Sequence, residues 1–430
     1  MFNHTNKILL IGYGISGKSI YKFLKAKGYQ ISVFDDFTLD IPDKITKIDW
    51  DLIDIIIKSP SIPFMPHNCH RLVQEAETRN IPIISTFDTF ILFNPGAKIV
   101  GITGTNGKST TVALTQYILK KANINSQMGG NIGIPYFDLP KADVYIFEMS
   151  SYELAGSKHL NFEIGCILNI EKDHLEFHGN FEEYVKAKHK ILDHSKIKII
   201  SAEDTLSVSK YPDALILSTN YDSKAYAYIL ENALFGDTKN IVIDLSGPLK
   251  LIGQHNHQNI EFSYAICRNF GVPNKKIENS VISFEPLPHR LNIIKKAGHI
   301  LFVNDSKATN PESAAKALRT FTGYKIYWLI GGISKKINPL TAVEAYLENV
   351  QRIYMFGESA NEFKNIFKSI KRTIKCKTMI QAIEMAYKEA SHTEELSVIL
   401  LSPMCASFDQ FKNFEHRGDE FIEAVIKLTE

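Results

Sequence analysis

Residues 98–121 read KIVGITGTNGKSTTVALTQYILKK. An apolar run at 98–102 is followed by a loop rich in glycine and threonine, and then by apolar residues at helical spacing. Backbone N–H groups of such a loop cradle phosphates, its lysine reaches the terminal phosphates, and the next hydroxyl can bind Mg²⁺. Ile102 takes the place of the first glycine of the usual GxxxxGK[ST] pattern, so a glycine-rich loop with an unrelated lysine is the alternative. We expect ATP to bind at Gly104, Thr105, Asn106, Gly107, Lys108, Ser109 and Thr110.

The rest of the chain repeats this alternation of apolar runs and segments of helical period, which is typical of βα units on parallel sheets. Breaks rich in proline and glycine at 94–96 and 285–288 divide the pattern. We expect an α/β protein of three consecutive domains, at 1–93, 94–285 and 286–430. Strands are expected at 7–11, 31–34, 53–57, 98–102, 144–148, 164–170, 300–303, 326–330, 353–356 and 398–401, a helix at 18–27, and no clear element within 221–253.

Bulk composition is that of an ordinary globular protein. The 430 residues are 44% hydrophobic and 22% charged, with a formal net charge of +2. This balance points neither to nucleic acid nor to a membrane surface, and no apolar run approaches the roughly 18 residues of a membrane helix. The N-terminus lacks a signal-peptide pattern, and the five cysteines form no CxxC pair. We expect a cytoplasmic protein with free thiols, no nucleic-acid partner and no membrane insertion.

A second glycine-rich turn, GYGISG, follows the first expected strand. Gly12, Gly14 and Gly17 match GxGxxG, and Asp35 and Asp36 come at the end of the next strand. The glycines let backbone N–H groups approach a diphosphate at a helix N-terminus, and an aspartate accepts from a ribose hydroxyl. The turn predicts a nucleotide with a diphosphate, for which a nicotinamide dehydrogenase is the obvious interpretation; a purely structural turn is the alternative.

Two further strands of the middle domain end in charged residues. Glu148 ends VYIFE and is a natural ligand for Mg²⁺, a hard cation that prefers oxygen. Asp173 and His174 follow CILNI, but a lone histidine in this place is more often hydrogen-bonded than a ligand. Lys188, in VKAKHK, is by itself typical of a solvated helix face. Of these residues, Glu148 is the one whose residue type by itself favours a role as a metal ligand.

Polar segments nearer the C-terminus leave two interpretations open. The segment GQHNHQN, residues 253–259, begins a helix, and its amides could cap that helix or bind a base edge. Residues 288–290, 304–310 and 402–410 lie at strand ends or in loops of the third domain, where open α/β sheets bind ligands. Their Arg, Lys, Ser and Thr side chains suit an anionic ligand.

Segments spread over nearly the whole chain carry a joint signature. In order, they are GYGISG, GITGTNGKST, GGNIG, EMSSYEL, NIEKDHLEFHG, GQHNHQN, LPHRL, NDSKATN and LSPMCASFDQFKNFEHRGDEF. Together they resemble the Mur ligases, in the type that adds D-glutamate, and NDSKATN and SPMCASFDQF are the most specific. The resemblance implies a Rossmann-like domain for a UDP-linked substrate, a central P-loop ATPase with a mostly parallel sheet, and a Rossmann-like domain for the incoming amino acid.

The resemblance also implies a reaction. ATP phosphorylates the carboxylate of UDP-N-acetylmuramoyl-L-alanine to an acyl phosphate, with Mg²⁺ bound. The amine of D-glutamate attacks that carbonyl, and the tetrahedral intermediate expels phosphate. This is a cytoplasmic step of peptidoglycan precursor synthesis, and we expect the enzyme to be a monomer.

Carried over position by position, the resemblance implies roles for residues of this chain. The catalytic residues are Lys108, Asn131, His174 and Lys188. The ligands of two expected Mg²⁺ ions are Ser109, Glu148, His174 and Lys188, the last as a carbamate derived from CO₂. The ATP contacts outside the loop are Asn256, Asn259, Arg290, Asp305 and Lys307. The contacts of the UDP substrate are Gly14, Ile15, Ser16, Asp35, Asp36 and Asn131. The contacts of D-glutamate are Lys335, Ser407 and Phe414.

Some positions depart from the family pattern. The segment SSYEL stands where SSFQL is common, so Glu153 brings a negative charge to a place expected near the substrate carboxylate. Ser61 replaces a common glycine near the UDP site, and Ile333 replaces a common aspartate close to Lys335.

Other protein classes explain only parts of the chain. A nicotinamide dehydrogenase explains GYGISG but not TGTNGKST, and a P-loop motor leaves the flanking domains without a role. A folylpolyglutamate synthase lacks the N-terminal GxGxxG domain. A nucleotide-gated binding module does not require Glu148, His174 and Lys188 together. We therefore expect a ligase.

Overall fold

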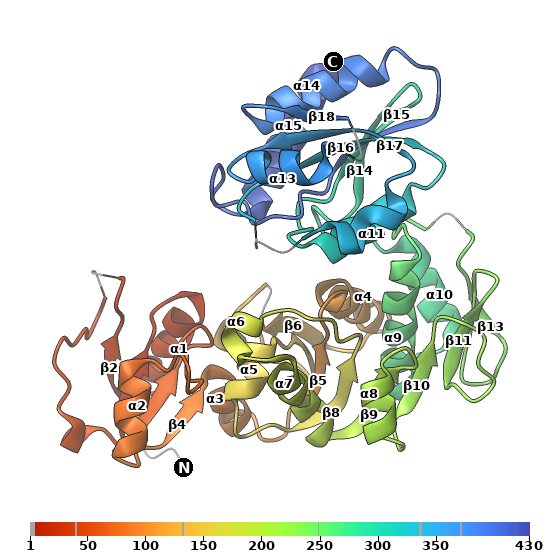
Figure 1. The fold of residues 1–430 in the computed structure, drawn as a ribbon. Coiled ribbons are helices and arrows are strands. Elements are labelled where there is room, and N and C mark those ends of the chain that lie inside the picture. Colours follow the sequence, from red (N-terminus) through yellow and green to blue (C-terminus); the bar gives the residue numbers. More distant parts are fainter. Residues whose placement is uncertain (1–4, 39–40, 131–132, 248, 335–337, 370–371) are drawn as a thin grey trace. The chain divides into compact units, whose positions relative to one another are not determined.

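The computed structural model of the chain describes residues 5–38, 41–130, 133–247, 249–334, 338–369 and 372–430 (Figure 1). The chain forms three sheets, each from its own stretch of sequence. Contacts group it into two compact units: Met1–Leu249 with His257–Phe284, which holds two sheets, and Lys250–Asn256 with Glu285–Glu430, which holds the third. The expected α/β class is confirmed, since helices alternate with strands in all three stretches.

The first sheet is parallel, in the order β2-β1-β3-β4. The central strands are continuous apolar runs because helices bury both faces, α1 on one side and α2 on the other. The predicted helix begins earlier than expected, because Gly14 already serves as its N-cap. The elements are β1 (Lys7–Ile11), α1 (Ile15–Ala26), β2 (Gln30–Phe34), β3 (Ile55–Lys58), α2 (Arg71–Thr78), β4 (Ile83–Ser85) and α3 (Thr86–Phe93).

The second sheet has nine strands, in the order β13-β12-β11-β10-β9-β8-β5-β7-β6. All pairings are parallel except those of β12, which runs antiparallel to both neighbours. The strands are β5 (Lys98–Thr103), β6 (Ser126–Gly130), β7 (Val144–Glu148), β8 (Phe162–Ile167), β9 (Ser195–Ser201), β10 (Leu215–Ser218), β11 (Ala227–Leu230), β12 (Ala233–Phe235) and β13 (Ile241–Asp244). The helices are α4 (Lys108–Lys121), α5 (Ser151–Gly156), α6 (Leu175–His178), α7 (Phe181–Asp193), α8 (Thr205–Lys210), α9 (His255–Asn269) and α10 (Asn274–Ser283).

Two features of this sheet differ from the sequence expectation. Residues 221–253, which gave no clear prediction, contain the last three strands, and these are too short to give a long apolar run. The strand expected at 164–170 ends at Ile167, because the chain then turns to hydrogen-bond the loop after β5. This turn places polar residues beside that loop.

The third sheet has the order β14-β15-β19-β16-β17-β18, and only β14 runs antiparallel to its neighbour. Its strands are β14 (Asn292–Ala297), β15 (Ile300–Asn304), β16 (Lys325–Gly331), β17 (Val350–Phe356), β18 (Thr373–Lys375) and β19 (Ser397–Leu401). Its helices are α11 (Pro311–Thr320), α12 (Leu340–Val343), α13 (Ala360–Phe367), α14 (Met379–Ala390) and α15 (Phe414–Thr429).

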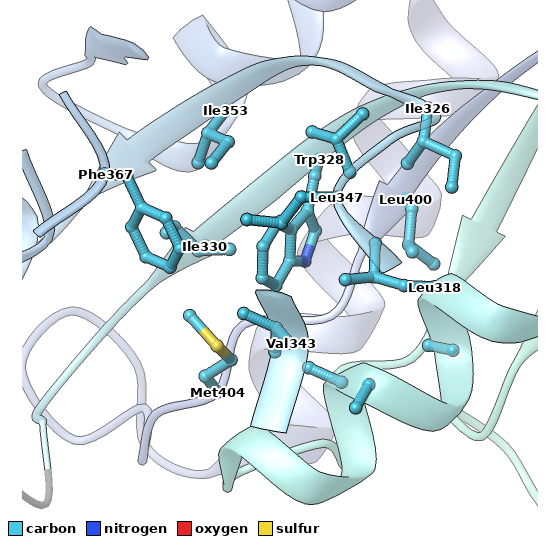
Figure 2. Close-up of a cluster of buried hydrophobic side chains, with 14 of the residues drawn as sticks. Leu318, Ile326, Trp328, Ile330, Val343, Leu347, Ile353, Phe367, Leu400 and Met404 are labelled. Carbon is cyan, nitrogen blue, oxygen red and sulfur yellow. The ribbon is translucent and has the colours of Figure 1, made fainter. Parts of the chain in front are cut away.

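Apolar layers cover both faces of the third sheet. On one face, Trp328 packs with Leu318, Val343 and Phe367 from three helices (Figure 2). Its indole N–H donates to the carbonyl of Ser402 at 2.9 Å, so the ring is buried with its polar atom satisfied. Helices α14 and α15 cover the other face. None of the described helices is long and apolar enough to cross a membrane.

Candidate active site

The loop between β5 and α4 has a backbone that requires glycine. Gly107 is the N-cap of α4 with φ +87°, a left-handed conformation that favours glycine. A Cβ there would lie 2.4 Å from the side-chain oxygen of Asn259, so space forbids it as well. Gly101 has a different role, because a Cβ at this strand position would lie within 2.8 Å of Phe162 and Ile191. Gly101 is therefore a packing glycine of β5, and the loop proper begins after it.

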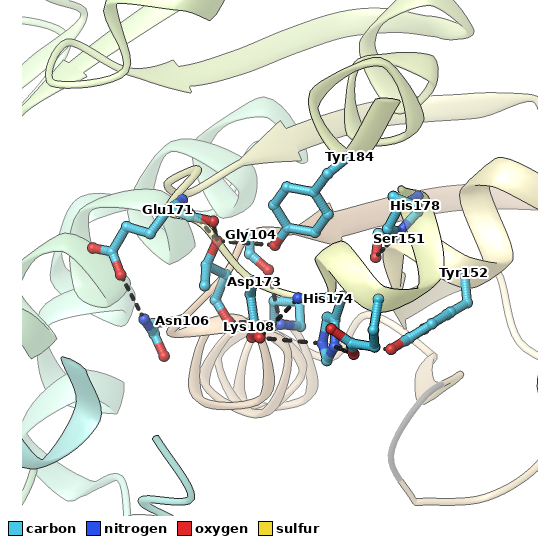
Figure 3. Close-up of polar contacts among 12 residues, drawn as sticks. Gly104, Asn106, Lys108, Ser151, Tyr152, Glu171, Asp173, His174, His178 and Tyr184 are labelled. Atoms are coloured by element: carbon cyan, nitrogen blue, oxygen red, sulfur yellow. Dashed lines mark hydrogen bonds and ion pairs between the residues drawn. The ribbon is translucent and has the colours of Figure 1, made fainter. Parts of the chain in front are cut away.

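Polar residues that follow β8 hold this loop from the side. Thr105 N–H donates to the carbonyl of Asn169 at 3.0 Å, and Asn106 N–H donates to the side-chain oxygen of Asn169 at 2.9 Å. The Asn106 amide donates to Glu171 at 3.0 Å, and the hydroxyls of Thr105 and Tyr184 lie 3.0 Å apart (Figure 3). Asn169, Glu171 and Tyr184 were not predicted as site residues; the signal for the first two was their place directly after an apolar strand.

The first turn of α4 meets the end of β7 at this loop. Lys108 Nζ donates to the carbonyls of Gly104 and Thr105 at 2.8 and 3.0 Å. The Ser109 hydroxyl donates to Glu148 Oε2 at 2.6 Å, and both side chains are buried. Thr110, the other hydroxyl of the motif, is also buried. The structure thus brings together a hydroxyl and a carboxylate, the hard oxygen donors that suit Mg²⁺.

His174 lies at the N-terminus of α6 in a left-handed backbone conformation, with φ +53°. Its Nδ1 lies 2.8 Å from the Tyr152 hydroxyl, and its Nε2 lies 3.5 Å from Asp173 Oδ2 (Figure 3). Within the described residues, no group of three or more His, Cys, Asp and Glu side chains is placed to hold a metal. The expected ligand set instead combines Glu148 and His174 with a serine hydroxyl and a modified lysine, and its oxygen donors fit Mg²⁺ by type.

Lys188 points into the protein, so its interpretation as part of a solvated helix face is wrong. The side chain, on α7, is 2% exposed, and Nζ donates to the carbonyl of Gly104 at 2.8 Å and to Thr103 Oγ1 at 3.2 Å. Burial, and then the cation of Lys108, lower the pKa of Lys188 well below its ordinary value, although Asp173 and Glu148 oppose this. The position of Lys188 beside the phosphate loop therefore favours a neutral amine.

The glycine turn after β1 leaves room for a ligand on one side only. A Cβ on Gly17 would lie 2.1 Å from the carbonyl of Gly12, whereas a Cβ on Gly14 would meet nothing within 4 Å. Gly14 and Ile15, which is 77% exposed, begin α1, and Ser16 beside them is half-buried. The open N-terminus of a helix is suited to a diphosphate.

Both aspartates after β2 have protein partners. Asp35 accepts from the backbone N–H of Tyr13 at 2.6 Å and also from the N–H groups of Phe37 and Thr38. Burial opposes ionisation, but these bonds outweigh it and hold the pKa of Asp35 below its ordinary value. Asp36 lies 2.9 Å from His70 Nε2 and forms an ion pair with the adjacent arginine. Asp35 therefore ties the glycine turn to the loop after β2.

The predicted ATP contacts on α9 both bond to protein. The Asn256 amide donates to the carbonyl of Ile252 at 2.6 Å. The side-chain oxygen of Asn259 accepts from the Thr111 hydroxyl at 3.1 Å, beside the phosphate loop. Asn131 and Lys335, also predicted as site residues, lie outside the described residues.

In the unit that contains the third sheet, the predicted residues gather at strand ends. Asp305 follows β15 and accepts from the Ser402 hydroxyl at 2.9 Å, and burial raises its pKa to about 7. Lys307 Nζ lies 3.8 Å from the ring centroid of Phe414, so a predicted ATP contact meets a predicted D-glutamate contact. Ser407 is buried, and Arg290 donates its backbone N–H to a nearby asparagine.

Arg417 was missed by the sequence analysis, although it lies in the quoted segment EHRGDEF. The guanidinium is fully buried and donates to the hydroxyl and the carbonyl of Ser306 at 2.9 and 2.7 Å. It also donates to the carbonyls of Gly331 and Cys405 at 3.2 and 3.1 Å. Arg417 therefore joins the end of β16 to the loops after β15 and β19, which carry predicted ATP and D-glutamate contacts.

Glu153, which stands in place of the family's common glutamine, is 3% exposed. Its Oε2 accepts from the Tyr136 hydroxyl at 2.5 Å, and its Oε1 is buried without a hydrogen-bond partner among the described residues. Lys58, also buried, is the nearby cation that favours ionisation of this carboxyl. The structure thus surrounds the carboxyl with protein instead of exposing its charge.

Glu153→Gln is expected to remove a pH-dependent part of the stability. Burial raises the pKa of Glu153 to about 7, whereas an unfolded chain has a glutamate pKa of about 4.3. The proton therefore stabilises the folded state fully below the unfolded pKa, and this stability is lost as the pH rises through the folded pKa. Wild-type protein should lose about 1–3 kcal/mol more than the glutamine variant between about pH 5 and about pH 8 in urea unfolding.

Glu182→Gln makes the same change at a side chain that is 78% exposed, and it serves as the control. It should leave the pH dependence of unfolding as in the wild type. Parallel pH profiles for Glu153→Gln and wild type would contradict the prediction.

Comparisons with known proteins identify the family of the chain. The model of the Mur ligase middle domain matches residues 102–267, and that of the Mur ligase glutamate ligase domain matches residues 289–405. The UDP-N-acetylmuramoylalanine–D-glutamate ligase of Rickettsia prowazekii is 35% identical over 97% of each chain. The ligase of the same name from Agrobacterium fabrum is 32% identical over 98% of this chain and 95% of its own.

Solved structures share the fold at lower identity. The UDP-N-acetylmuramate–alanine ligase of Thermotoga maritima has a TM-score of 0.64 at 18% identity, over 98% of this chain and 99% of its own. A pseudomurein peptide ligase of Methanothermus fervidus has a TM-score of 0.64 at 20% identity, over 98% of this chain and 100% of its own. The expected three-domain α/β fold is confirmed, and the chain belongs to the Mur ligase family, within its group of UDP-N-acetylmuramoylalanine–D-glutamate ligases.

Proposed function

We propose that this chain joins D-glutamate to UDP-N-acetylmuramoyl-L-alanine at the expense of ATP, as a cytoplasmic step of peptidoglycan precursor synthesis. The observation that carries the proposal is the 35% identity to the Rickettsia prowazekii ligase over 97% of each chain. The phosphate loop and the Ser109–Glu148 pair supply the chemistry that an ATP-driven ligase needs. The domain boundaries at 1–93, 94–285 and 286–430, and the monomeric state, stay predictions.

The reaction begins with transfer of the terminal phosphoryl group of ATP to the substrate carboxylate. Backbone N–H groups of the loop other than those of Thr105 and Asn106, which bond to Asn169, bind phosphate oxygens. Lys108 offsets the charge that spreads over the transferred group. The acyl phosphate then provides a good leaving group, so the neutral amine of D-glutamate attacks the carbonyl. The tetrahedral intermediate collapses with loss of phosphate, and the amide remains.

The residues around Ser109 and Glu148 fit a role in holding Mg²⁺. The Ser109 hydroxyl and the Glu148 carboxylate lie 2.6 Å apart at the end of β7. We assign them as ligands together with His174 and the carbamate of Lys188, for two ions. When bound, Mg²⁺ supplies positive charge that stabilises the phosphate oxygens during transfer.

Carbamylation of Lys188 is supported by the state of its amine. CO₂ reacts with a neutral amine, and the burial of Lys188 favours that state. The carbamate would carry a negative charge, which offsets the neighbouring cation of Lys108 and adds oxygen donors. A lysine on a solvated face would gain neither of these effects.

Release of phosphate tests the proposal directly. With ATP, Mg²⁺ and UDP-N-acetylmuramoyl-L-alanine present, we expect phosphate to appear only when D-glutamate is added, and the product to be an amide by mass spectrometry. No change in NADH absorbance is expected under any of these conditions. Phosphate release that requires a different amino acid would overturn the proposal.

Lys108→Ala is expected to lower kcat at least about a hundredfold. A loss of this size is typical when one group that stabilises the charge developing in the transition state is removed. The physical reason is that the charge of the transferred phosphoryl group would be left without its ammonium partner. Phosphate release at saturating substrates measures kcat. Lys120→Ala changes an exposed lysine of the same helix and should retain wild-type turnover. Near-normal turnover of Lys108→Ala would rule out the assignment of this loop.

A further inference from the structure

Two hydrogen bonds join the segments SSYEL and DHLEFH, which lie on α5 and around α6. The Tyr152 hydroxyl lies 2.8 Å from His174 Nδ1, and the Ser151 hydroxyl lies 2.9 Å from His178 Nε2 (Figure 3). The two hydroxyl-bearing residues are adjacent in sequence, and the two histidines are one helical turn apart. The roles proposed so far use neither Tyr152 nor Ser151.

We propose that Tyr152 is a positioning residue that fixes the imidazole of His174 through Nδ1 and leaves Nε2 to face the metal. This inference rests on the proposed role of His174 as a ligand of Mg²⁺. It concerns a hydroxyl that the common family segment SSFQL does not have, because phenylalanine stands there in place of Tyr152.

The Tyr152 ring is held firmly enough to orient its neighbour. Its centroid lies 4.3 Å from that of Phe177 in an edge-to-face contact, and 5.9 Å from that of His178 in a stacked contact. His178 is buried, and its bond to Ser151 fixes it in turn. His174, by contrast, has a side chain that is 35% exposed. A packed phenol thus contacts a partly exposed imidazole through Nδ1.

Metal binding determines which ring nitrogen of His174 must form the hydrogen bond to Tyr152. A histidine binds a metal through an unprotonated nitrogen, so a ligand nitrogen at Nε2 puts the remaining proton on Nδ1. Nδ1–H then donates to the phenolic oxygen of Tyr152, and this bond fixes both tautomer and ring orientation. Nε2 lies 3.5 Å from Asp173 Oδ2, on the side where negative charge favours a cation.

Glu176 also lies near Nδ1, and it is a weaker partner than Tyr152. Its Oε1 lies 3.5 Å from Nδ1, which is longer than a hydrogen bond, and its side chain is 76% exposed. Ordering an exposed glutamate costs side-chain entropy, whereas Tyr152 is already packed. Of these two groups, the tyrosine is therefore the better partner for Nδ1.

Tyr152→Phe tests the inference because it removes one oxygen and keeps the ring that packs on Phe177. Mn²⁺ is the probe, and the protein is in complex with a non-hydrolysable ATP analogue. We expect Mn²⁺ to bind about tenfold more weakly to the variant than to the wild type, which is the lower end of the losses in metal affinity when a ligand loses its hydrogen-bond partner. Electron paramagnetic resonance measures free Mn²⁺ directly and needs no turnover. In ¹⁵N-histidine spectra, the His174 signal should lose its single Nδ1–H tautomer and become a mixture.

Ser151→Ala is the matched control, since it removes the parallel bond between the same two segments but not the bond to His174. It should leave the His174 tautomer as in the wild type, which separates orientation of the ring from general stability. His174→Gln tests the underlying metal role. If that variant binds Mn²⁺ like the wild type, the metal assignment fails and the inference with it. If His174→Gln weakens binding but Tyr152→Phe does not, the inference alone is overturned.

Discussion

Replacing Lys188 with alanine is expected to lower kcat at least about a thousandfold, which leaves almost no ligase activity. This is the upper end of the losses in kcat that follow removal of one group that stabilises developing charge. Lys188 is 2% exposed and contacts the carbonyl of Gly104, so no solvent or neighbouring side chain can simply take its place. Its carbamate would supply an anion where the loop otherwise carries the cation of Lys108. Phosphate release at saturating ATP and both substrates gives the measurement.

Small carboxylates should partly restore the Lys188→Ala enzyme. We expect acetate or formate to enter the space that the truncation leaves beside Gly104, where their oxygens replace those of the carbamate. Rescue should saturate with added anion and should be absent for Lys108→Ala, which loses a cation. Lys186→Ala, an exposed lysine two positions earlier on α7, should behave as wild type. Full activity of Lys188→Ala without any added anion would refute the carbamate.

Discrimination between the glutamate enantiomers is the second large effect, and we expect at least about a thousandfold higher kcat/KM for D-glutamate than for L-glutamate. Glutamate brings two carboxylates and an amine that must be neutral to attack. We assign one carboxylate to Lys335 and the other to the Ser407 hydroxyl with nearby backbone N–H groups, and the methylenes to Phe414. Two anchors and one direction of attack define three points, so L-glutamate can fill both anchors only with its amine turned away from the carbonyl.

Shorter and differently charged amino acids should fail for related reasons. D-aspartate is one methylene short of spanning both anchors, and a diamino acid brings a second cation to a site to which we assign a lysine. Groups left unpaired in a buried site are costly, so the loss should be comparable to that for L-glutamate.

The assay compares each amino acid at fixed ATP and UDP-N-acetylmuramoyl-L-alanine. Ser407→Ala should raise mainly the KM for D-glutamate, because it removes an anchor and leaves the phosphoryl transfer intact. Comparable rates with both enantiomers, or faster addition of a diamino acid, would refute the assignment of these anchors.

The sequence alone was sufficient for those features that a short stretch of chain determines. The strand 144–148 and the helix that ends at Lys121 agree with the structure, because an apolar run and a helical period are local properties. The phosphate loop could be found in the same way, since its glycines and its lysine must follow one another directly. The order of such segments along the chain was enough to indicate the family.

Only the tertiary structure decided what surrounds each side chain. Lys188 has the sequence context of a solvated helix face, yet packing of α7 against the sheet buries it beside Gly104, a loop residue far away in sequence. Glu153 meets Tyr136, and Arg417 bonds to two loops and to the end of β16, through contacts that no local pattern encodes. The physical reason is that periodicity reports which face of an element is apolar, whereas the charge state and the partners of a buried polar group depend on segments that folding brings together from elsewhere in the chain.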